Sequence, residues 1–157
     1  MQTVGVLSRL ARTLGHRRWF ARMGKAIVPL DRAVAKLTKG RVIALGIMPT
    51  LVLTTTGRKS GQARNQPLVY VRDGGNYVVI GSNWGQTSHP AWSGNLLANP
   101  DATITLDGRQ VPVRGVLARG AERERLFGLL LAVWPAYRTY GERAGDRELR
   151  VFTLTPR

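Results

Sequence analysis

The chain has 157 residues, 43% of them hydrophobic, which is enough for one compact domain with a proper core and too little for two ordinary domains. It has no cysteine, which excludes disulfides, thiolate metal sites and cysteine nucleophiles. Its two histidines, His16 and His89, have no spacing typical of a zinc or iron site, so no bound metal is expected. The formal net charge of +15 predicts an anionic partner: nucleic acid, an anionic lipid surface or a highly charged small molecule.

The N-terminal part carries a disproportionate share of the positive charge. Residues 1–49 contain ten Lys and Arg side chains and a single acid. In the first twenty residues apolar side chains recur at helical spacing with arginines opposite them, which predicts an amphipathic basic helix. A second helical stretch is expected from Met23 to Lys39. We therefore divide the chain into a basic helical leader, residues 1–45, and a main domain, residues 46–157.

Two interpretations of this leader remain open. Residues 1–22 either bind an anionic membrane surface or pack their apolar stripe on the domain and leave the arginines in water. No apolar segment is long enough to span a bilayer, and the first residues lack the pattern of a secretion signal. The expected location is cytoplasmic, with peripheral attachment to the inner face of the cell membrane as an option.

From Thr50 onward the pattern changes to short runs typical of β-strands. The predicted strands are Thr50 to Thr56, Gln66 to Arg72, Asn76 to Ser82, Ala102 to Leu106, Arg109 to Leu117 and Arg150 to Leu154. Glycine-rich turns at residues 72–75 and 107–108 predict hairpins, so the sheet should be mainly antiparallel. Helices are expected from about Pro90 to Ala98 and from about Ala121 to Val133. This order predicts an α+β fold with a barrel or half-open barrel.

A basic turn lies between the first two predicted strands, at residues 54–64. Gly57 and Gly61 allow a tight turn and close approach to a ligand, and the turn's polar donors suit a phosphate or carboxylate. These donors are Arg58, Lys59, Ser60 and Arg64. A nucleoside-triphosphatase loop is excluded, because it needs a glycine before the lysine and a helix after it. The alternative is a solvated hairpin turn that binds nothing.

A second polar loop, Gly81 to Gln86, follows the third predicted strand and leads to His89 and Trp92. Its Gly, Ser and Asn residues can present backbone N–H groups, and nearby tryptophans can stack on a flat ring, which favours a planar cofactor. Trp92 is equally typical of a buried core position.

Farther along the chain, Tyr137 and Tyr140 are three residues apart and would share one face of a short helix. Their hydroxyls either donate hydrogen bonds into a pocket or cap the core. No activated nucleophile or acid and base pair is evident, so a bound cofactor is the simpler route to activity.

Several of these motifs, in this order, resemble the deazaflavin-dependent nitroreductase family of actinobacteria. The resemblance covers about residues 50 to 156 and rests on the runs LTTTGRKSGQAR at 53–64, GSN at 81–83, HPAW at 89–92, NLLANP at 95–100 and WPAYRTY at 134–140. It implies a split β-barrel of the flavin-binding type that holds reduced coenzyme F420. It also implies hydride transfer to quinones, nitroaromatics or similar electron-poor acceptors.

The resemblance also assigns expected roles to residues. The grip on the phosphate and oligoglutamate tail of the coenzyme would be Arg58, Lys59, Ser60 and Arg64, which accounts for part of the positive charge. The deazaflavin ring would be lined by Gln66, Pro67, Leu68, Gly81, Ser82, Asn83 and Trp84, and faced from the short helix by Trp92, Asn95 and Leu96. Tyr137 and Tyr140 resemble the acceptor-side tyrosines of the family.

Four positions depart from the family pattern. Val69 and Ser93 stand where some members have tyrosine, Asn83 replaces a lysine and Trp84 a glycine, so the acceptor range is open. An enzyme of this fold that uses FMN is the first alternative. A non-catalytic module that binds nucleic acid is the second, although the aromatic residues do not alternate with arginines as in a stacking platform. The sequence leaves the oligomeric state open, with a dimer as one option.

Overall fold

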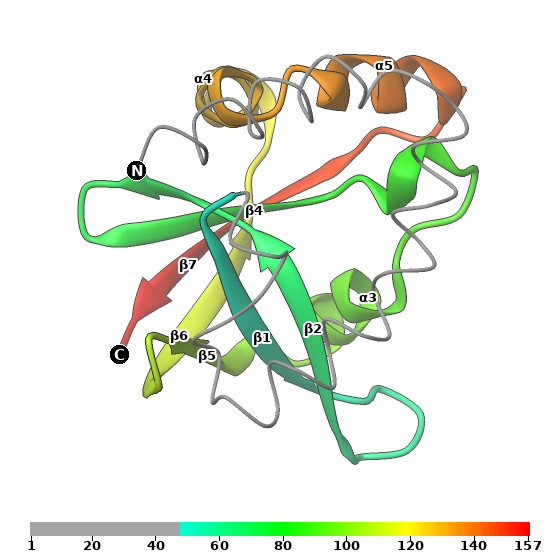
Figure 1. Cartoon of the computed structure of the whole chain (residues 1–157). Helices are drawn as coiled ribbons and strands as arrows, with labels where there is room; N and C mark the ends of the chain where they lie inside the picture. Colours follow the sequence, from blue (N-terminus) through cyan, green and yellow to red (C-terminus); the bar gives the residue numbers. More distant parts are fainter. Residues whose placement is uncertain (1–47) are drawn as a thin grey trace.

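The computed structural model describes residues 48–157, which form one curled antiparallel sheet with helices on both faces (Figure 1). The strands are β1 (Thr50–Thr56), β2 (Ala63–Val69), β3 (Val71–Asp73), β4 (Asn76–Gly81), β5 (Asp101–Leu106), β6 (Arg109–Leu117) and β7 (Arg150–Pro156). The helices are the 3₁₀ turn η2 (Asn83–Gly85), α3 (Ala91–Ala98), α4 (Gly120–Val133) and α5 (Ala136–Arg143). The prediction of a mainly antiparallel split barrel with inserted helices is confirmed.

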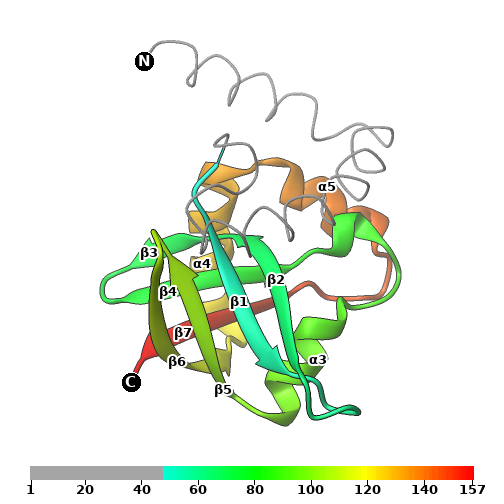
Figure 2. The same cartoon turned by 60° about the horizontal axis from the view of Figure 1, so that its bottom comes forward.

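The sheet curls because its two edge strands are joined by one residue. The seven strands are ordered β2-β1-β5-β6-β7-β4-β3, so β2 and β3 form opposite edges although only Tyr70 separates them in the chain. Tyr70 donates its backbone N–H to the carbonyl of Pro49 at 3.2 Å. The chain can pass from one edge to the other in a single residue only if the edges approach each other, which gives the half-barrel seen in Figure 2.

The predicted strands are found with small differences at their ends. Thr50–Thr56 and Arg109–Leu117 agree with the prediction residue for residue. The single strand predicted from Gln66 to Arg72 is wrong, because this run is divided between β2, which pairs with β1, and β3, which pairs with β4. Its apolar pattern continues through Tyr70 without a break, so only the pairing shows the division.

Both predicted hairpin turns are present. Leu106 pairs with Arg109 across Asp107 and Gly108, whose φ angles of 50° and 76° are those of a tight turn with left-handed residues. Asp73 pairs with Asn76 across Gly74 and Gly75, and Gly74 has a φ of 59°. These turns fix the register within the strand pairs β5–β6 and β3–β4.

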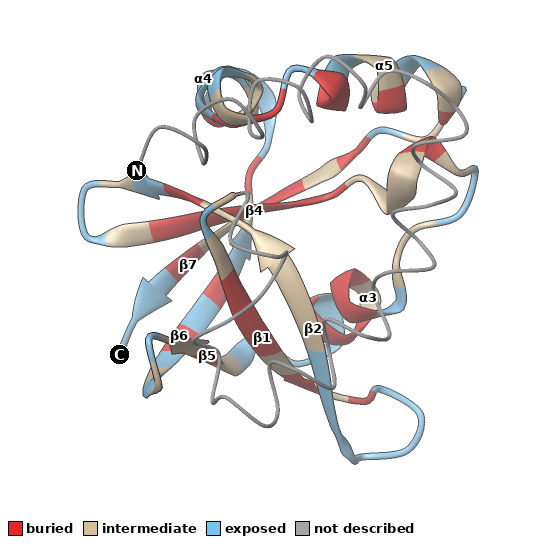
Figure 3. Cartoon of the chain, in the orientation of Figure 1, coloured by how far each residue is buried: buried red, intermediate tan, exposed pale blue. Residues whose placement is uncertain are grey.

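Two apolar cores lie on opposite faces of the sheet (Figure 3). Helix α3 packs inside the curl, where Trp92 lies against Phe152 with ring centroids 5.7 Å apart. Helices α4 and α5 cover the outer face of β4 and β7. This second core includes the large side chains of Trp134 and Tyr140, which have 5% and 1% of their surface exposed.

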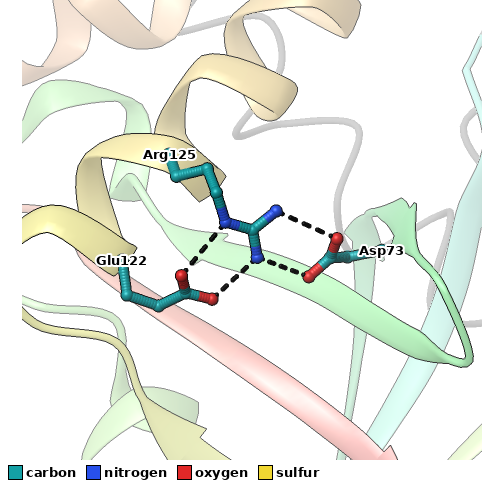
Figure 4. A network of polar contacts seen from close by, with 3 residues as sticks. All are labelled: Asp73, Glu122 and Arg125. Atoms are coloured by element: carbon teal, nitrogen blue, oxygen red, sulfur yellow. Dashed lines mark hydrogen bonds and ion pairs between the residues drawn. The ribbon is translucent and has the colours of Figure 1, made fainter.

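Helix α4 is also attached to the edge strand β3 by one arginine. Arg125 donates Nη1 and Nη2 to the two carboxylate oxygens of Asp73, at 3.1 and 2.8 Å, and Nε and Nη2 to Glu122, at 3.0 and 2.8 Å (Figure 4). Both carboxyls have a lowered pKa, first because Arg125 hydrogen-bonds to them. The network thus fixes the start of α4 over the β3–β4 hairpin.

The predictions for the leader, residues 1–45, fall outside the described residues, as do the amphipathic helix of residues 1–22 and His16. Within residues 48–157, no helix combines the length and the apolar character that a membrane span requires. The boundary between residues 45 and 46 stays a prediction.

Candidate functional site

The basic turn after β1, called the cationic loop from here on, is closed by internal hydrogen bonds. Gly57 donates its N–H to the Gln62 carbonyl at 2.7 Å, and Gly61 donates to the Gly57 carbonyl at 2.8 Å. The hydroxyl of Ser60 accepts from the Gln62 N–H at 3.2 Å and from Arg64 Nη2 at 3.4 Å. A Cβ on Gly57 would lie 2.5 Å from that hydroxyl, so a side chain there would displace Ser60 and its hydrogen bonds. The loop therefore has a defined shape, with Lys59 and Arg64 exposed on it.

Arg58 joins this loop to helix α3. Its backbone N–H donates to Asn95 Oδ1 at 3.1 Å, and its Nη1 donates to the carbonyl of Ala91 at 3.0 Å. Asn95, which is buried, donates its Nδ2 to Thr55 Oγ1 at 3.2 Å. Asn95 thus connects β1, the loop and the helix.

The second predicted loop begins where β4 ends and contains η2. Asn83, Trp84 and Gly85 have positive φ angles of 45°, 56° and 76°, an unusual run for two residues with side chains. Asn83 Nδ2 donates to the Ser88 carbonyl at 2.8 Å, and the Trp84 ring meets Tyr140 edge-on with centroids 5.9 Å apart. The sequence predicted an irregular polar loop here but not the 3₁₀ turn.

Sequence reasoning missed Arg147, which lies between α5 and β7. Its guanidinium donates to the backbone carbonyls of Gly81, Ser82 and Gln86 at 3.0, 2.7 and 2.9 Å, so it spans the second loop. In sequence it stands in the charged run Asp146-Arg147-Glu148, which is typical of solvated surface, and no local signal marks it.

Three arginines, Arg58, Arg147 and Arg150, border the start of α3. Arg147 Nη1 lies 3.3 Å from His89 Nδ1, and Arg150 Nη1 donates to Ser93 Oγ at 3.1 Å. Burial, followed by the charges of Arg150 and Arg147, lowers the pKa of His89, which favours its neutral form. The pKa of Arg150 is also lowered, by burial and then by Arg58. The site is therefore electropositive without His89.

The two tyrosines lie on the buried face of α5, which confirms the predicted short helix. Their rings meet edge-on with centroids 6.2 Å apart, and the Tyr140 hydroxyl accepts a hydrogen bond from Trp134 Nε1 at 3.3 Å. Burial is the main cause that raises the pKa of both phenols. Both hydroxyls therefore stay protonated at neutral pH.

The remaining predicted ring residues differ in their exposure. Trp92 and Leu96 are buried in the inner core, and Leu96 packs on Gly115, where a Cβ would lie 2.7 Å from it. Gln66, Pro67 and Leu68 lie half-buried on β2, opposite Leu53, Val52 and Leu51 respectively.

Helix α3 brings the two predicted loops together. The first loop is attached to α3 at Ala91 and Asn95, and the second leads directly into it through Pro90, whose Cγ lies 3.2 Å from where a Cβ on Gly81 would be. A loop with exposed cations is therefore attached along the first two turns of α3, and a backbone loop with an aromatic neighbour precedes its first residue. Such a site can hold a ligand with an anionic end and a flat ring.

A split barrel with these two loops suits a cofactor-dependent oxidoreductase, and comparison with known proteins shows the family to which the chain belongs. The sequence pattern of the F420H(2)-dependent quinone reductase family matches residues 30–156, and the chain belongs to this family. Reduced F420, and not FMN, is the cofactor that defines the family.

Two relatives from Mycobacterium tuberculosis illustrate the similarity. The F420H(2)-dependent quinone reductase Rv1261c is 37% identical over 99 residues, which is 61% of this chain and 66% of that protein. Rv3178 is 42% identical over 80 residues, which is 51% of this chain and 67% of that protein. The chain thus spans about two thirds of the length of these relatives.

Two solved structures share the fold. An F420-H2 dependent reductase, FDR-A, superposes with a TM-score of 0.62 at 34% identity, over 68% of this chain and 93% of the other. A protein described as a domain-swapped dimer superposes with a TM-score of 0.63 at 30% identity, over 80% and 95% of the two chains.

Proposed function

We propose that this chain binds reduced coenzyme F420 across its two loops and passes a hydride to a quinone. The observation that carries the proposal is that the cationic loop is bonded to the first two turns of α3 while the Gly81–Trp84 loop precedes the same helix and packs on Pro90. The coenzyme has the matching parts, since its tail is anionic and its deazaflavin ring is flat.

The tail is assigned to Lys59, Ser60 and Arg64, with Arg58 beside them. Support comes from the exposure of Lys59 and Arg64 and from the closed shape of their loop. Arg58 has a double role in this proposal, because its guanidinium already fastens the loop to α3. Its charge still favours an anion nearby.

The ring is assigned to the loop formed by Gly81, Ser82, Asn83 and Trp84, with β2 residues Gln66, Pro67 and Leu68 across from it. Trp92, Asn95 and Leu96 support the site from the core, since all three are buried. Asn83 uses its amide within the loop, so a ring contact from this residue comes from its backbone.

The protein's chemical task is to orient the acceptor and to let a proton reach it. When bound, reduced F420 supplies a hydride. A quinone that accepts a hydride needs one proton to become the hydroquinone. Both phenols keep their protons at neutral pH, but the Tyr140 hydroxyl is bound to Trp134, so we assign to the Tyr137 hydroxyl the hydrogen bond to the acceptor oxygen, while solvent delivers the proton. Nitro compounds, as other electron-poor acceptors, belong to the same proposal.

Titration of F420 with the purified protein tests this function. We expect the fluorescence of the coenzyme to change on binding, followed by turnover with menadione and slower turnover in a nitroaromatic panel. Firm binding of FMN with no response to F420 would assign the chain to the flavin-using alternative. Tight binding of duplex or single-stranded nucleic acid at physiological salt, with no coenzyme bound, would favour the non-catalytic module.

We also propose that residues 1–22 attach the protein to anionic membrane, where lipid-soluble quinones are present. The motive is the apolar stripe with its arginines, each worth about 1 kcal/mol near an anionic surface. Full-length protein should sediment with anionic vesicles at low salt and be released by salt. A variant that starts near Leu45 should stay in the supernatant and still reduce a soluble acceptor. If full-length protein also stays in the supernatant, the leader has no membrane role.

A further inference from the structure

Arg147 is held by the second loop in an unusual way. All three of its guanidinium nitrogens donate to backbone carbonyls of that loop, at Gly81, Ser82 and Gln86, and Nη1 also faces His89 Nδ1. Among residues 48–157, the partners of Arg147 are these carbonyls and this imidazole, and none is a carboxylate. Arg147 therefore acts through charge-assisted hydrogen bonds to the loop backbone and not through an ion pair, which makes the shape of the loop depend on it.

The geometry of the three bonds suits arginine and no other residue. A planar guanidinium presents five donors in a fixed fork, whereas a lysine ammonium is a point charge on a flexible stem. Carbonyls from residues 81, 82 and 86 are brought around one plane, although the intervening residues Asn83 and Trp84 have left-handed backbone angles. If Arg147 were lost, the loop would have to hold this strained backbone shape with three fewer hydrogen bonds.

The bonds also orient the opposite side of the loop. In a trans peptide the C=O and the N–H of one unit point in opposite directions, and residues 48–157 contain no cis bond. Carbonyls 81, 82 and 86 point at Arg147, so the N–H groups of Ser82, Asn83 and Thr87 point away from it. Three backbone donors of the loop are thereby directed to its other side.

We propose that Arg147 is a positioning residue that presets this loop, and so its backbone donors, for the flat ring of the coenzyme. The inference rests on the proposed function, which places the ring at this loop. It assigns Arg147 no contact with the coenzyme. Loss of Arg147 should therefore weaken binding of the ring, whatever is attached to it, and loosen the loop before any ligand is present.

Two probes separate the ring from the tail: F420 itself and the same deazaflavin without its phosphate and oligoglutamate tail, called here the tail-less deazaflavin. We would titrate both into wild type, R147Q, R147K, the double variant R58A/K59A and the control R109Q, which removes an exposed arginine from β6. Thermal unfolding and amide hydrogen exchange of residues 81–87 would be measured without ligand.

We expect R147Q to weaken both probes by a similar factor, roughly tenfold or more, since charge-assisted bonds are lost. R147K should weaken both by a smaller factor and speed exchange at 81–87. R58A/K59A should weaken the binding of F420 but leave the affinity for the tail-less deazaflavin within about twofold of wild type. R109Q should change neither affinity.

Wild type that binds neither probe would overturn the proposed function. If wild type binds both probes, and R147Q and R147K bind the tail-less deazaflavin as tightly as wild type does, only the role of Arg147 is overturned. If R147Q does not fold, R147K decides in the same way, and failure of both to fold would make Arg147 a folding residue and refute the inference.

Discussion

The guanidinium of Arg58 lies directly over the α-carbon of Gly94. A Cβ at position 94 would be 2.5 Å from Nη1 and 2.9 Å from the central carbon of that guanidinium. A glycine in the middle of α3 is unfavourable for the helix by itself. Its presence is explained by the arginine that crosses it and fixes the cationic loop to the helix.

G94A should therefore displace Arg58 and leave the fold intact. The clash is with the end of a flexible side chain, and alanine stabilises a helix interior by about 0.5 to 1 kcal/mol over glycine, so stability should change by less than about 1 kcal/mol. F420 affinity should fall, and amide exchange at residues 57–62 should rise. Unchanged exchange in a folded G94A protein would show that Arg58 does not hold the loop.

Removing both loop cations should affect the coenzyme far more than the fold. We expect R58A/K59A to weaken F420 binding by about 2 to 4 kcal/mol, because each charge-assisted bond is worth about 1.5 to 3 kcal/mol before partial solvation is discounted. Calorimetric titration measures the change, with R109Q as the matched control for loss of charge. Full affinity in the double variant would place the tail elsewhere.

The two tyrosines should respond differently to loss of the hydroxyl. Y137F should lower kcat with quinone by about tenfold to a hundredfold if its hydroxyl polarises the acceptor, with little change in Tm. Y140F should lower stability by about 0.5 to 1.5 kcal/mol, because it removes the hydroxyl that accepts the Trp134 N–H at 3.3 Å. Steady-state kinetics beside thermal unfolding separates these effects. Equal kcat in Y137F and wild type would show that the Tyr137 hydroxyl does not polarise the acceptor.

Gly115 should be intolerant of a side chain. A Cβ there would lie 2.7 Å from two atoms of Leu96, which is fully enclosed by the inner core and has no room to move. We expect G115A to lose about 1 to 3 kcal/mol in chemical unfolding, as overpacked cores do. G128A, at an exposed position of α4 where a Cβ meets nothing, is the control and should be neutral or stabilising.

The Asp73–Arg125–Glu122 network should make stability sensitive to acid. Both carboxyls have a folded pKa below the unfolded one, so the stability they contribute is present above the unfolded pKa and is lost as the pH falls through the folded pKa. The difference in unfolding free energy between wild type and R125Q should therefore be largest near neutral pH and shrink below about pH 4. Urea unfolding over this range measures it. A difference that does not depend on pH would contradict the assignment, and R109Q should show no such trend.

Much of the fold follows from local patterns in the sequence. Asp107 and Gly108 demand a tight turn, and the runs on either side alternate as half-buried strands do, so this hairpin is predictable from its own residues. The break at Tyr70 is not predictable in this way, because it results from pairing with two partners that lie on opposite edges of the sheet. Local propensity contains no information about such a choice of partners.

The candidate site shows the same division. The cationic loop was predictable because its glycines and charges are adjacent in the chain. The contacts of Arg147 were not, since they join residues 61 to 66 positions apart through backbone carbonyls, which every residue type possesses. Trp92 is equally apolar whether it faces a ring or a core, and only its packing on Phe152 shows the core position.

The position of β7 has a consequence for how the protein is made. Although this strand is the last of the described strands, it lies inside the sheet between β6 and β4. Without it, the four strands β2-β1-β5-β6 and the hairpin β3-β4 have no shared hydrogen bonds with each other. A nascent chain on the ribosome therefore cannot complete the barrel until Arg150–Pro156 has left the exit tunnel. Until then both edges that β7 will occupy are open, and they can accept the same strand from a second molecule.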